Sequence, residues 1–424
     1  MLVLTANVAL TPKPAEKDKS MPSSIDEILE EEEFREEADT REDVDDLSTL
    51  SQNLLSQSVL SATDWTAETV LNQINKRNIL LNPNFQRRDA WEKVRKSRFI
   101  ESLILNLPVP QLVLAEAKNR KGEYIVIDGK QRLLSIRQFA SKPDDKDFEQ
   151  LKLAGLSIRK DLNGKTLDDL KSDPAFFSDL SAFENQSIRT VVIRNWPNES
   201  FLYQVFLRLN TGSVSLSPQE LRQALHPGKF VEFVDTTSGD SQALREILKL
   251  KKPDFRMRDV ELLVRFYAFK NFLQGYSGNL KEFLDYTCER LNNEWEKRNS
   301  EIIDQASEFE MAYQTAREIF QQKHVFRKWL GSKYEPRFNR AIFDVMMLYF
   351  SDPDIRVKAI SNKEGVEQKF KELCVNDSKF LGAIERTTKS LEATQIRIST
   401  WARSLNEVLD LALPIPAIVS GRIR

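Results

Sequence analysis

One turn between an apolar segment and a segment of helical spacing has the chemistry of an anion site. It consists of five residues, Asp128, Gly129, Lys130, Gln131 and Arg132. Glycine permits a backbone conformation that other residues avoid, and the free N–H groups at the start of a helix favour a negative charge. Two cationic side chains in the same turn strengthen this effect. The turn therefore predicts a phosphate site.

The side chains of this turn suggest individual roles. Arg132 can form paired, charge-assisted hydrogen bonds with phosphate oxygens. Asp128 is the one acid of the turn, so it is the candidate to hold a divalent cation or to accept a proton from attacking water. Gln131 can orient that water. The alternative is structural: Asp128 and Arg132 pair with each other and only fix the turn.

Two further polar motifs stand far from the turn in the sequence. Gln86 and Arg87 precede Trp91, whereas Asn210 and Thr211 begin a polar loop. Arg87 offers a second guanidinium for phosphate, and the loop offers hydrogen-bonding groups that would close a pocket from the far side. The loop leads into a helix start with the spacing of a capping box, at Ser217, Pro218 and Glu220.

The spacing of apolar residues predicts the elements that carry these motifs. Residues 112–114 and 124–127 are typical of a hairpin, and residues 188–193 of a further strand. Residues 91–107 have helical spacing. From residue 256 onward, stripes of apolar and aromatic residues indicate helices almost exclusively, and such stripes usually form a core. The sequence therefore predicts an α+β protein with an N-terminal α/β domain and a mainly α-helical C-terminal region.

The net charge of −2 conceals an uneven distribution. Residues 26–46 contain thirteen acids and two arginines, a net charge of −11, so the rest of the 424-residue chain carries about +9 (−2 + 11). Residues 1–62 are too polar to form a core, and we predict a disordered acidic tail there. Such a tail either keeps the protein in solution or competes with nucleic acid for a basic face of the body.

Several other kinds of site are disfavoured. The two cysteines, Cys288 and Cys374, are far apart, which argues against a disulfide framework or a zinc cluster and favours a reducing compartment. The two histidines are also distant, and His226 before a proline is expected to end a helix. No Walker A or G-x-G-x-x-G pattern occurs. No apolar segment reaches the roughly 20 residues of a membrane span. We therefore expect a cytoplasmic protein without a membrane partner.

Four motifs in this order resemble the DUF262 family, the N-terminal domain of GmrSD-type modification-dependent restriction enzymes and related phage-defence proteins. The resemblance covers roughly residues 65 to 230, and the helical remainder resembles the usual extension of such proteins. It is carried by Gln86-Arg87 with Trp91, Glu101-Ser102-Leu103 before Pro108, the turn from Asp128 to Leu133, and Leu209 to Gly212 with Leu216 to Arg222.

The resemblance implies a ParB/sulfiredoxin-like fold for residues 63–230 and a helical domain for residues 231–424. It also implies that a nucleoside triphosphate is bound or hydrolysed with Mg²⁺, in several relatives as part of DNA restriction. The helical domain would then transmit the nucleotide state to DNA or to a partner. One residue departs from the family pattern: Lys130 stands where a glutamine is frequent, which would weaken hydrolysis if that glutamine positions water.

Two alternatives to an NTP hydrolase remain. One is a direct DNA endonuclease, although the signature of the C-terminal nuclease domain (DUF1524) that fused relatives carry is not found. Asp128-Gly129-Lys130 also resembles half of a metal-dependent nuclease site, but no partner carboxylate stands at a convincing spacing. The other alternative is a non-catalytic regulatory subunit that binds nucleotide and pairs with a separate nuclease.

Overall fold

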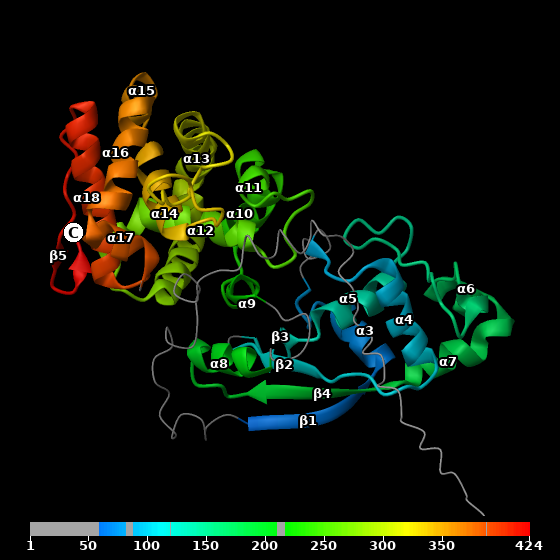
Figure 1. Cartoon of the computed structure of the whole chain (residues 1–424). Helices are drawn as coiled ribbons and strands as arrows, with labels where there is room; N and C mark the ends of the chain where they lie inside the picture. The colour runs from blue at the N-terminus through cyan, green and yellow to red at the C-terminus, as the bar shows by residue number, and fades with distance from the viewer. Residues whose placement is uncertain (1–58, 82–87, 119, 210–216, 387) are drawn as a thin grey trace, which may run out of the picture.

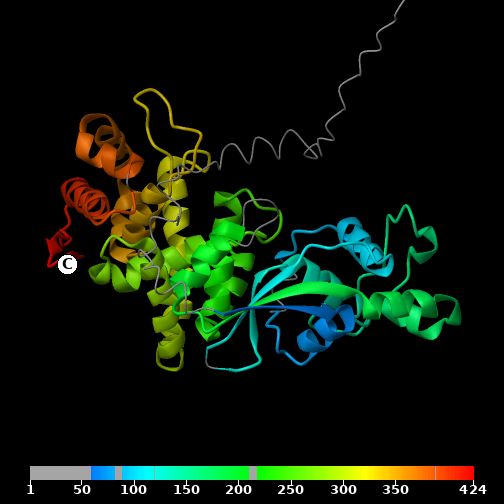
Figure 2. The same cartoon turned by 90° about the horizontal axis from the view of Figure 1, so that it is seen from below.

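The computed structural model of the chain describes residues 59–81, 88–118, 120–209, 217–386 and 388–424. A sheet-containing part comes first in the sequence, and an α-helical part lies beside it (Figures 1 and 2). This arrangement confirms the predicted α+β class. Within the described residues, no helix combines the length and the apolar character needed to cross a membrane.

The sheet-containing part is built on a four-stranded mixed sheet with the order β1-β4-β2-β3. β1 pairs antiparallel with β4, β4 pairs parallel with β2, and β2 pairs antiparallel with β3. The predicted hairpin and the predicted strand at residues 188–193 are therefore both confirmed. The strands are β1 (Val59–Thr66), β2 (Leu112–Glu116), β3 (Tyr124–Asp128) and β4 (Ser187–Arg194).

The first strand begins earlier than the sequence predicted. Residues 59–62 were assigned to the tail, but they pair with β4 as the start of β1. Val59 and Leu60 are 48% and 66% exposed, so backbone pairing with a distant segment holds this edge strand rather than a buried face. Hydrophobic spacing therefore gave no sign of it.

Helices cover both faces of the sheet. Alternation along the strands sends Leu114 and Val126 to one face, and Val113 and Ile127 to the other. The first face is covered by α3 (Ala67–Asn75), α4 (Lys93–Ile104), α5 (Lys130–Phe139) and α7 (Phe177–Asn185). The second face is covered by α8 (Glu199–Leu209) and α9 (Pro218–Leu225).

The segment between α5 and α7 forms short helices at the end of the molecule that is remote from the helical part (Figure 1). These are η4 (Lys160–Leu162), α6 (Leu167–Ser172) and η5 (Pro174–Phe176). They lie next to α7 and well away from α8 and α9. This end of the molecule therefore offers positions for control substitutions.

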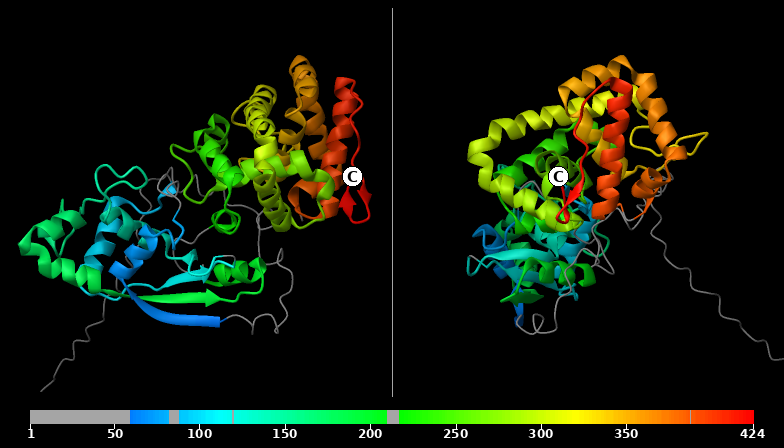
Figure 3. Two further views of the ribbon diagram at one scale, coloured as in Figure 1. Left: turned by 180° about the vertical axis from the view of Figure 1, so that it is seen from behind. Right: turned by 90° about the vertical axis from the view of Figure 1, so that its left-hand side faces the viewer.

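The helical part has one large apolar core, into which the predicted stripes of apolar and aromatic residues are buried. Its longest element is α13, a helix of 41 residues, and α18 lies at the outer end, away from the sheet (Figure 3). Its helices are α10 (Lys229–Asp240), α11 (Gln242–Ile247), α12 (Arg258–Phe272), η6 (Leu273–Gly275), α13 (Leu280–Phe320), α14 (Arg340–Phe350), α15 (Pro353–Ser361), α16 (Lys363–Asn376), α17 (Ser378–Glu385) and α18 (Leu391–Leu409).

The sequence did not predict the small hairpin at the end of the chain. It is formed by β5 (Ile418–Val419) and β6 (Arg422–Ile423), and the backbone N–H of Ile423 donates to the carbonyl of Tyr276. Strands of two residues are too short for a periodic pattern, which explains the omission.

The two parts of the molecule are joined through α9. This helix contacts β3 on one side and α12 on the other. Leu134 of α5 and the nearby Phe148 also belong to the core of the helical part. A change at the start of α5 or α9 therefore lies close to the boundary between the two parts.

Candidate functional site

The turn between β3 and α5 requires a glycine for two reasons. Gly129 is the N-cap of α5 and has φ +102°, a left-handed conformation that favours glycine. In addition, a Cβ atom at this position would lie 2.4 Å from Cδ2 of Leu112. The prediction that Gly129 adopts a backbone conformation that other residues avoid is therefore confirmed. The turn brings the side chains of Asp128 and Arg132 together at the start of α5.

Asp128 and Arg132 form an ion pair, as the structural alternative proposed. The Nη2 atom of Arg132 lies 2.7 Å from Oδ2 of Asp128. The pair is not closed to solvent, because 30% of the Asp128 side chain is exposed, compared with 9% for Arg132. Gly129, the N-cap of α5, provides no side-chain hydrogen bond to the first N–H groups of the helix. The turn thus places a partly exposed carboxylate beside a guanidinium at the start of α5.

Lys130 points to a different partner. Its ammonium group pairs with Oε1 of Glu220 in α9, and both side chains are almost completely buried. The other oxygen of Glu220 accepts a hydrogen bond of 2.7 Å from the backbone N–H of Ser217, within the predicted capping box. Glu220 therefore links the start of α5 to the start of α9, directly after residues 210–216.

Gln131 connects the turn to the chain near the first motif. Its Oε1 atom accepts a hydrogen bond of 3.2 Å from the backbone N–H of Trp91. The Trp91 ring packs edge-on against Phe99, and Arg95 lies over its face. The segment that follows residues 82–87 is therefore held against the first turn of α5.

The structure brings five of the predicted site residues together in one turn, from Asp128 to Arg132. The other four, Gln86, Arg87, Asn210 and Thr211, lie outside the described residues. Trp91, which follows the first of these motifs in the sequence, and Glu220, which follows the second, both contact the turn.

The sequence did not identify a buried ion cluster around Arg88. The Arg88 guanidinium is 1% exposed; its Nε atom lies 2.7 Å from Asp235 and its Nη1 atom 2.6 Å from Asp259. It also donates to the carbonyl of Asp254 and to the hydroxyl of Ser238. Burial alone would lower the pKa of Arg88, but the charges of Asp259 and Asp235 raise it, so the guanidinium stays cationic.

This Arg88 cluster joins the segment before α4 to α10 and α12 of the helical part. Gln223 of α9 extends the cluster, because its Nε2 atom donates to the second oxygen of Asp235 at 3.1 Å. Arg88 and Trp91 are three residues apart, so one short segment contacts both the α5 turn and the helical part. The adjacent arginines at 87 and 88 are visible in the sequence, but no spacing rule predicts that Arg88 is buried.

One group of potential metal ligands lies elsewhere in the described residues, at Glu199, His226 and Asp285. Asp285 is already bonded to Arg222 at 2.7 Å and to Lys281 at 2.6 Å. Burial would raise the pKa of Asp285, but these two cations lower it below its ordinary value. A metal ion would be placed beside two positive charges, so this group is better explained as an ion-pair network.

The prediction for His226 is confirmed. This residue is the C-cap of α9, as its position before a proline indicated. Cys288 and Cys374 are buried in α13 and α16.

Comparison with known families identifies a match for the sheet-containing part of the chain. Residues 67–227 match the family described as the GmrSD restriction endonuclease, N-terminal domain. This result confirms the resemblance recognised from the motifs. No curated protein and no solved structure matches the chain, so the ParB/sulfiredoxin-like fold stays a prediction.

Proposed function

Residues 67–227 form a GmrSD-type N-terminal domain, and on this premise we propose that the chain is a nucleotide-binding and NTP-hydrolysing protein of a restriction or phage-defence system. The proposed site is the start of α5. A nucleoside triphosphate is the proposed ligand, with Mg²⁺ as cofactor. The helical part would respond to the nucleotide and act on DNA or on a separate nuclease subunit.

One observation carries this proposal: the residues that flank two distant motifs are both bonded to the α5 turn. Gln131 holds the backbone of Trp91, which follows Gln86 and Arg87 in the sequence. Lys130 holds Glu220, which follows the loop containing Asn210 and Thr211. Described residues that follow two separate motifs in the sequence therefore both contact the α5 turn. We infer from these contacts that the three motifs contribute to one ligand site.

Arg132 is proposed to bind a phosphate group. Its Nη2 donor now serves Asp128, and a phosphate oxygen offers the same planar guanidinium a stronger, charge-assisted pairing. The uncapped N–H groups at the start of α5 would add further donors. The structure of the turn thus supports recognition of an anion without requiring Lys130, whose charge is balanced by Glu220.

Asp128 fits the role of a Mg²⁺ ligand. The Arg132 contact occupies Oδ2, and the side chain remains 30% exposed. Mg²⁺ is commonly held by one or two carboxylates together with substrate phosphates, so a single open carboxylate is sufficient from the protein side. When bound, the ion would neutralise charge on the phosphates. Asp128 could also accept a proton from water. Because the side-chain oxygen of Gln131 already accepts a hydrogen bond from Trp91, its side-chain NH₂ group is the part that can orient that water.

A turnover assay with Mg²⁺ tests this proposal in the full chain. We expect Asp128→Ala to abolish NTP hydrolysis and Arg132→Ala to weaken NTP binding by roughly tenfold or more. The matched control is Arg159→Ala, since Arg159 also pairs with aspartates, at 2.6 Å with Asp161, but lies in the segment before α6. Unchanged NTP binding in Arg132→Ala would remove the α5 turn from the site. No binding at millimolar NTP by the wild type would refute the proposal.

A nucleotide-binding regulatory subunit is the second candidate, and the Lys130–Glu220 pair favours it. Lys130 stands at the position where the family frequently has a glutamine, and its charge is held by the buried Glu220. If that glutamine positions water in relatives, this chain binds nucleotide without hydrolysing it. Tight NTP binding without turnover, with or without DNA, would identify this function. DNA cleavage that needs no nucleotide would instead indicate a direct endonuclease.

A further inference from the structure

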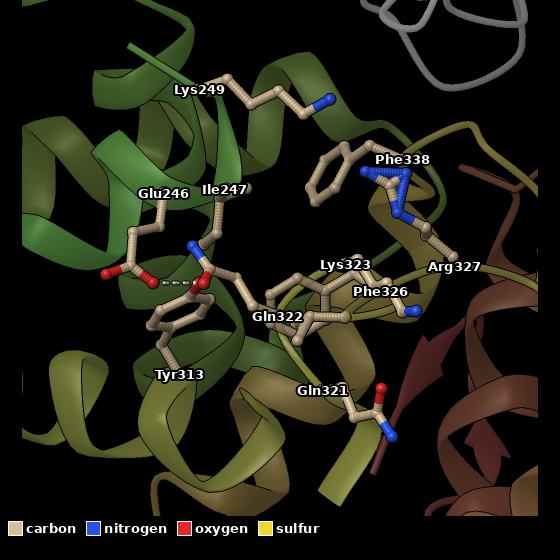
Figure 4. Close-up of a pocket in the computed structure, with 11 residues that line it drawn as sticks. Glu246, Ile247, Lys249, Tyr313, Gln321, Gln322, Lys323, Phe326, Arg327 and Phe338 are labelled. Atoms are coloured by element: carbon tan, nitrogen blue, oxygen red, sulfur yellow. Dashed lines mark hydrogen bonds between the residues drawn. The ribbon is translucent and has the colours of Figure 1, made fainter. Parts of the chain in front are cut away.

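A cavity with a distinct chemical character lies in the helical part. It has a volume of about 500 Å³ and lies where the end of α13 meets α11 and the loop that leads to α14 (Figure 4). Its lining includes Lys249 after α11, Tyr313 of α13 and the loop residues from Gln321 to Arg327. None of the residues of the α5 turn lines it. The cavity is therefore a separate candidate site.

Positive charge predominates in this cavity. Lys249, Lys323 and Arg327 line it, compared with one acid, Glu246. The Glu246 carboxylate already accepts a hydrogen bond of 2.8 Å from the hydroxyl of Tyr313, drawn in Figure 4, and another from Gln242. A ligand that enters this cavity would meet cationic groups on several sides, so an anion is favoured.

Lys323 is the cation most open to a ligand. No carboxylate in the described part of the chain lies within ion-pair distance of its ammonium group. The neighbouring His324 is also affected by this positive charge. Burial lowers the pKa of its imidazole, and the charges of Lys323 and Arg327 lower it further. A negatively charged group bound here would relieve that repulsion.

Aromatic side chains stand beside these cations. The Phe338 ring faces the cavity between Lys249 and Arg327 (Figure 4). An edge-on contact with Phe326 and a tilted contact with Phe343, at centroid distances of 6.1 and 5.8 Å, hold this ring in place. A fixed ring next to cationic side chains is the combination that binds a base and its phosphate in nucleic-acid-binding proteins.

The backbone around the cavity is strained. Nine non-glycine residues in the described ranges have a positive φ, and three of them line this one cavity: Lys249, Gln321 and Phe326. Gln321, with φ 60° and ψ 148°, occupies a region that is almost exclusive to glycine. Such conformations cost free energy, and they concentrate at binding sites where they fix the direction of side chains.

We propose that this cavity binds a nucleotide unit, with the phosphate against Lys249, Lys323 and Arg327 and the base against Phe338. The unit would come either from a free mononucleotide or from the 5′-phosphorylated end of a DNA strand. The proposal does not rest on the function of the α5 turn. The two proposed sites share no residue, so a substitution can disrupt one and leave the other intact.

Calorimetric titration with adenosine 5′-monophosphate tests the phosphate contact. Wild type and Arg132→Ala should both bind it at this cavity, whereas Lys323→Glu should bind at least tenfold more weakly, because a charge-assisted hydrogen bond becomes a repulsion. Lys297→Glu is the matched control, since it makes the same charge change on an exposed position of α13, 16 residues from Tyr313 and thus roughly 24 Å away. Equal affinities of Lys323→Glu and Lys297→Glu would overturn the proposal.

A second variant tests the base contact. Phe338→Leu keeps an apolar side chain but removes the ring, so it should weaken adenosine 5′-monophosphate by about fivefold or more and leave binding of inorganic phosphate unchanged. Equal loss for both ligands, or no loss for either, would contradict the assigned orientation. A 5′-phosphorylated oligothymidine of six nucleotides distinguishes the sources: binding tighter than the mononucleotide, and lost without the 5′-phosphate, assigns the site to a DNA end. If only Arg132→Ala abolishes nucleotide binding, this proposal fails and the α5 site stands.

Discussion

Two arginine–aspartate pairs lie close to the proposed nucleotide site, and they differ in their access to solvent. The Arg132–Asp128 pair at the α5 turn has side chains that are 9% and 30% exposed. The Arg88–Asp259 pair, between the segment before α4 and the helical part, has both side chains 1% exposed. The residue types are the same, but only the Arg132–Asp128 pair has a carboxylate that a ligand from solvent could reach.

The surroundings of each guanidinium explain the difference. All three nitrogen atoms of the Arg88 guanidinium donate to groups of the protein, and Asp235 provides two of the acceptors. For Arg132, the Nη2–Oδ2 bond is the contact within the turn, and Asp128 keeps an open side. A satisfied, enclosed arginine holds two parts of a fold together. An arginine with an accessible partner remains available to an anion.

The largest expected effect is on stability, from replacing the enclosed arginine. Arg88→Met removes the guanidinium and leaves Asp235 and Asp259 buried without their cation. We expect the free energy of unfolding to fall by about 3–5 kcal/mol, the cost of breaking a buried ion pair from one side. Urea unfolding followed by circular dichroism measures this change.

The control for Arg88→Met is Arg159→Met, whose side chain is 27% exposed and pairs with Asp161 and Asp179. It should cost about 1 kcal/mol or less, as surface ion pairs do. If the two substitutions cost the same, enclosure is not what distinguishes the Arg88 cluster, and the comparison fails.

The next largest effect is expected at Lys130. This residue lies between Asp128 and Arg132 in the sequence, but its side chain is buried, as that of Arg88 is. Lys130→Gln restores the residue that is frequent in the family, but it leaves the Glu220 carboxylate buried without the ammonium group. We expect a loss of about 1–3 kcal/mol in the free energy of unfolding, measured by urea titration.

The double variant Lys130→Gln with Glu220→Gln sharpens this result. An amide pair should recover part of the loss, because no buried charge remains. A loss in the double variant equal to the sum of the single losses would show that Lys130 and Glu220 are not coupled. A rise in NTP turnover in the double variant would identify the lysine as the reason for slow hydrolysis.

Local features of α5 and α9 were predictable from the sequence. The left-handed glycine at 129, the capping box of Ser217 and Glu220, and the end of α9 at His226 depend on residues within a few positions of each other. Each has a spacing that can be recognised without the fold. The hairpin of β2 and β3 was predicted for the same reason.

The partners of the charged residues were not predictable. Arg88 pairs with Asp235, 147 residues later, and Lys130 pairs with Glu220, 90 residues later. No spacing rule connects such positions, because packing of α9 and α10 against the sheet-containing part brings them together. The sequence therefore predicts an anion site at the α5 turn but could not show that Lys130 pairs with Glu220.

The Arg132–Asp128 pair should contribute little to stability, although Arg132 is proposed to contribute strongly to NTP binding. Arg132→Ala is expected to lower the free energy of unfolding by about 1 kcal/mol or less, because solvent screens the partly exposed Asp128. Measured beside Arg88→Met by the same urea titration, it tests the comparison directly. A loss as large as that of Arg88→Met would mean that the turn is a structural lock.

A third arginine–aspartate pair, at the other end of α5, should give the smallest effect and also a pH dependence. Arg137 and Asp145 are 2.6 Å apart and each is 16% exposed. Burial raises the pKa of Asp145, but hydrogen bonds from Arg137 and from two backbone N–H groups lower it below its ordinary value. The carboxylate therefore stabilises the fold at neutral pH, and this contribution is lost as the pH falls through the pKa of the folded state. Asp145→Asn should cost about 0.5–1 kcal/mol at pH 7 and less at pH 3. Urea titrations at both pH values measure this difference, and a cost that does not change with pH would show that the ionic part of such a pair contributes nothing.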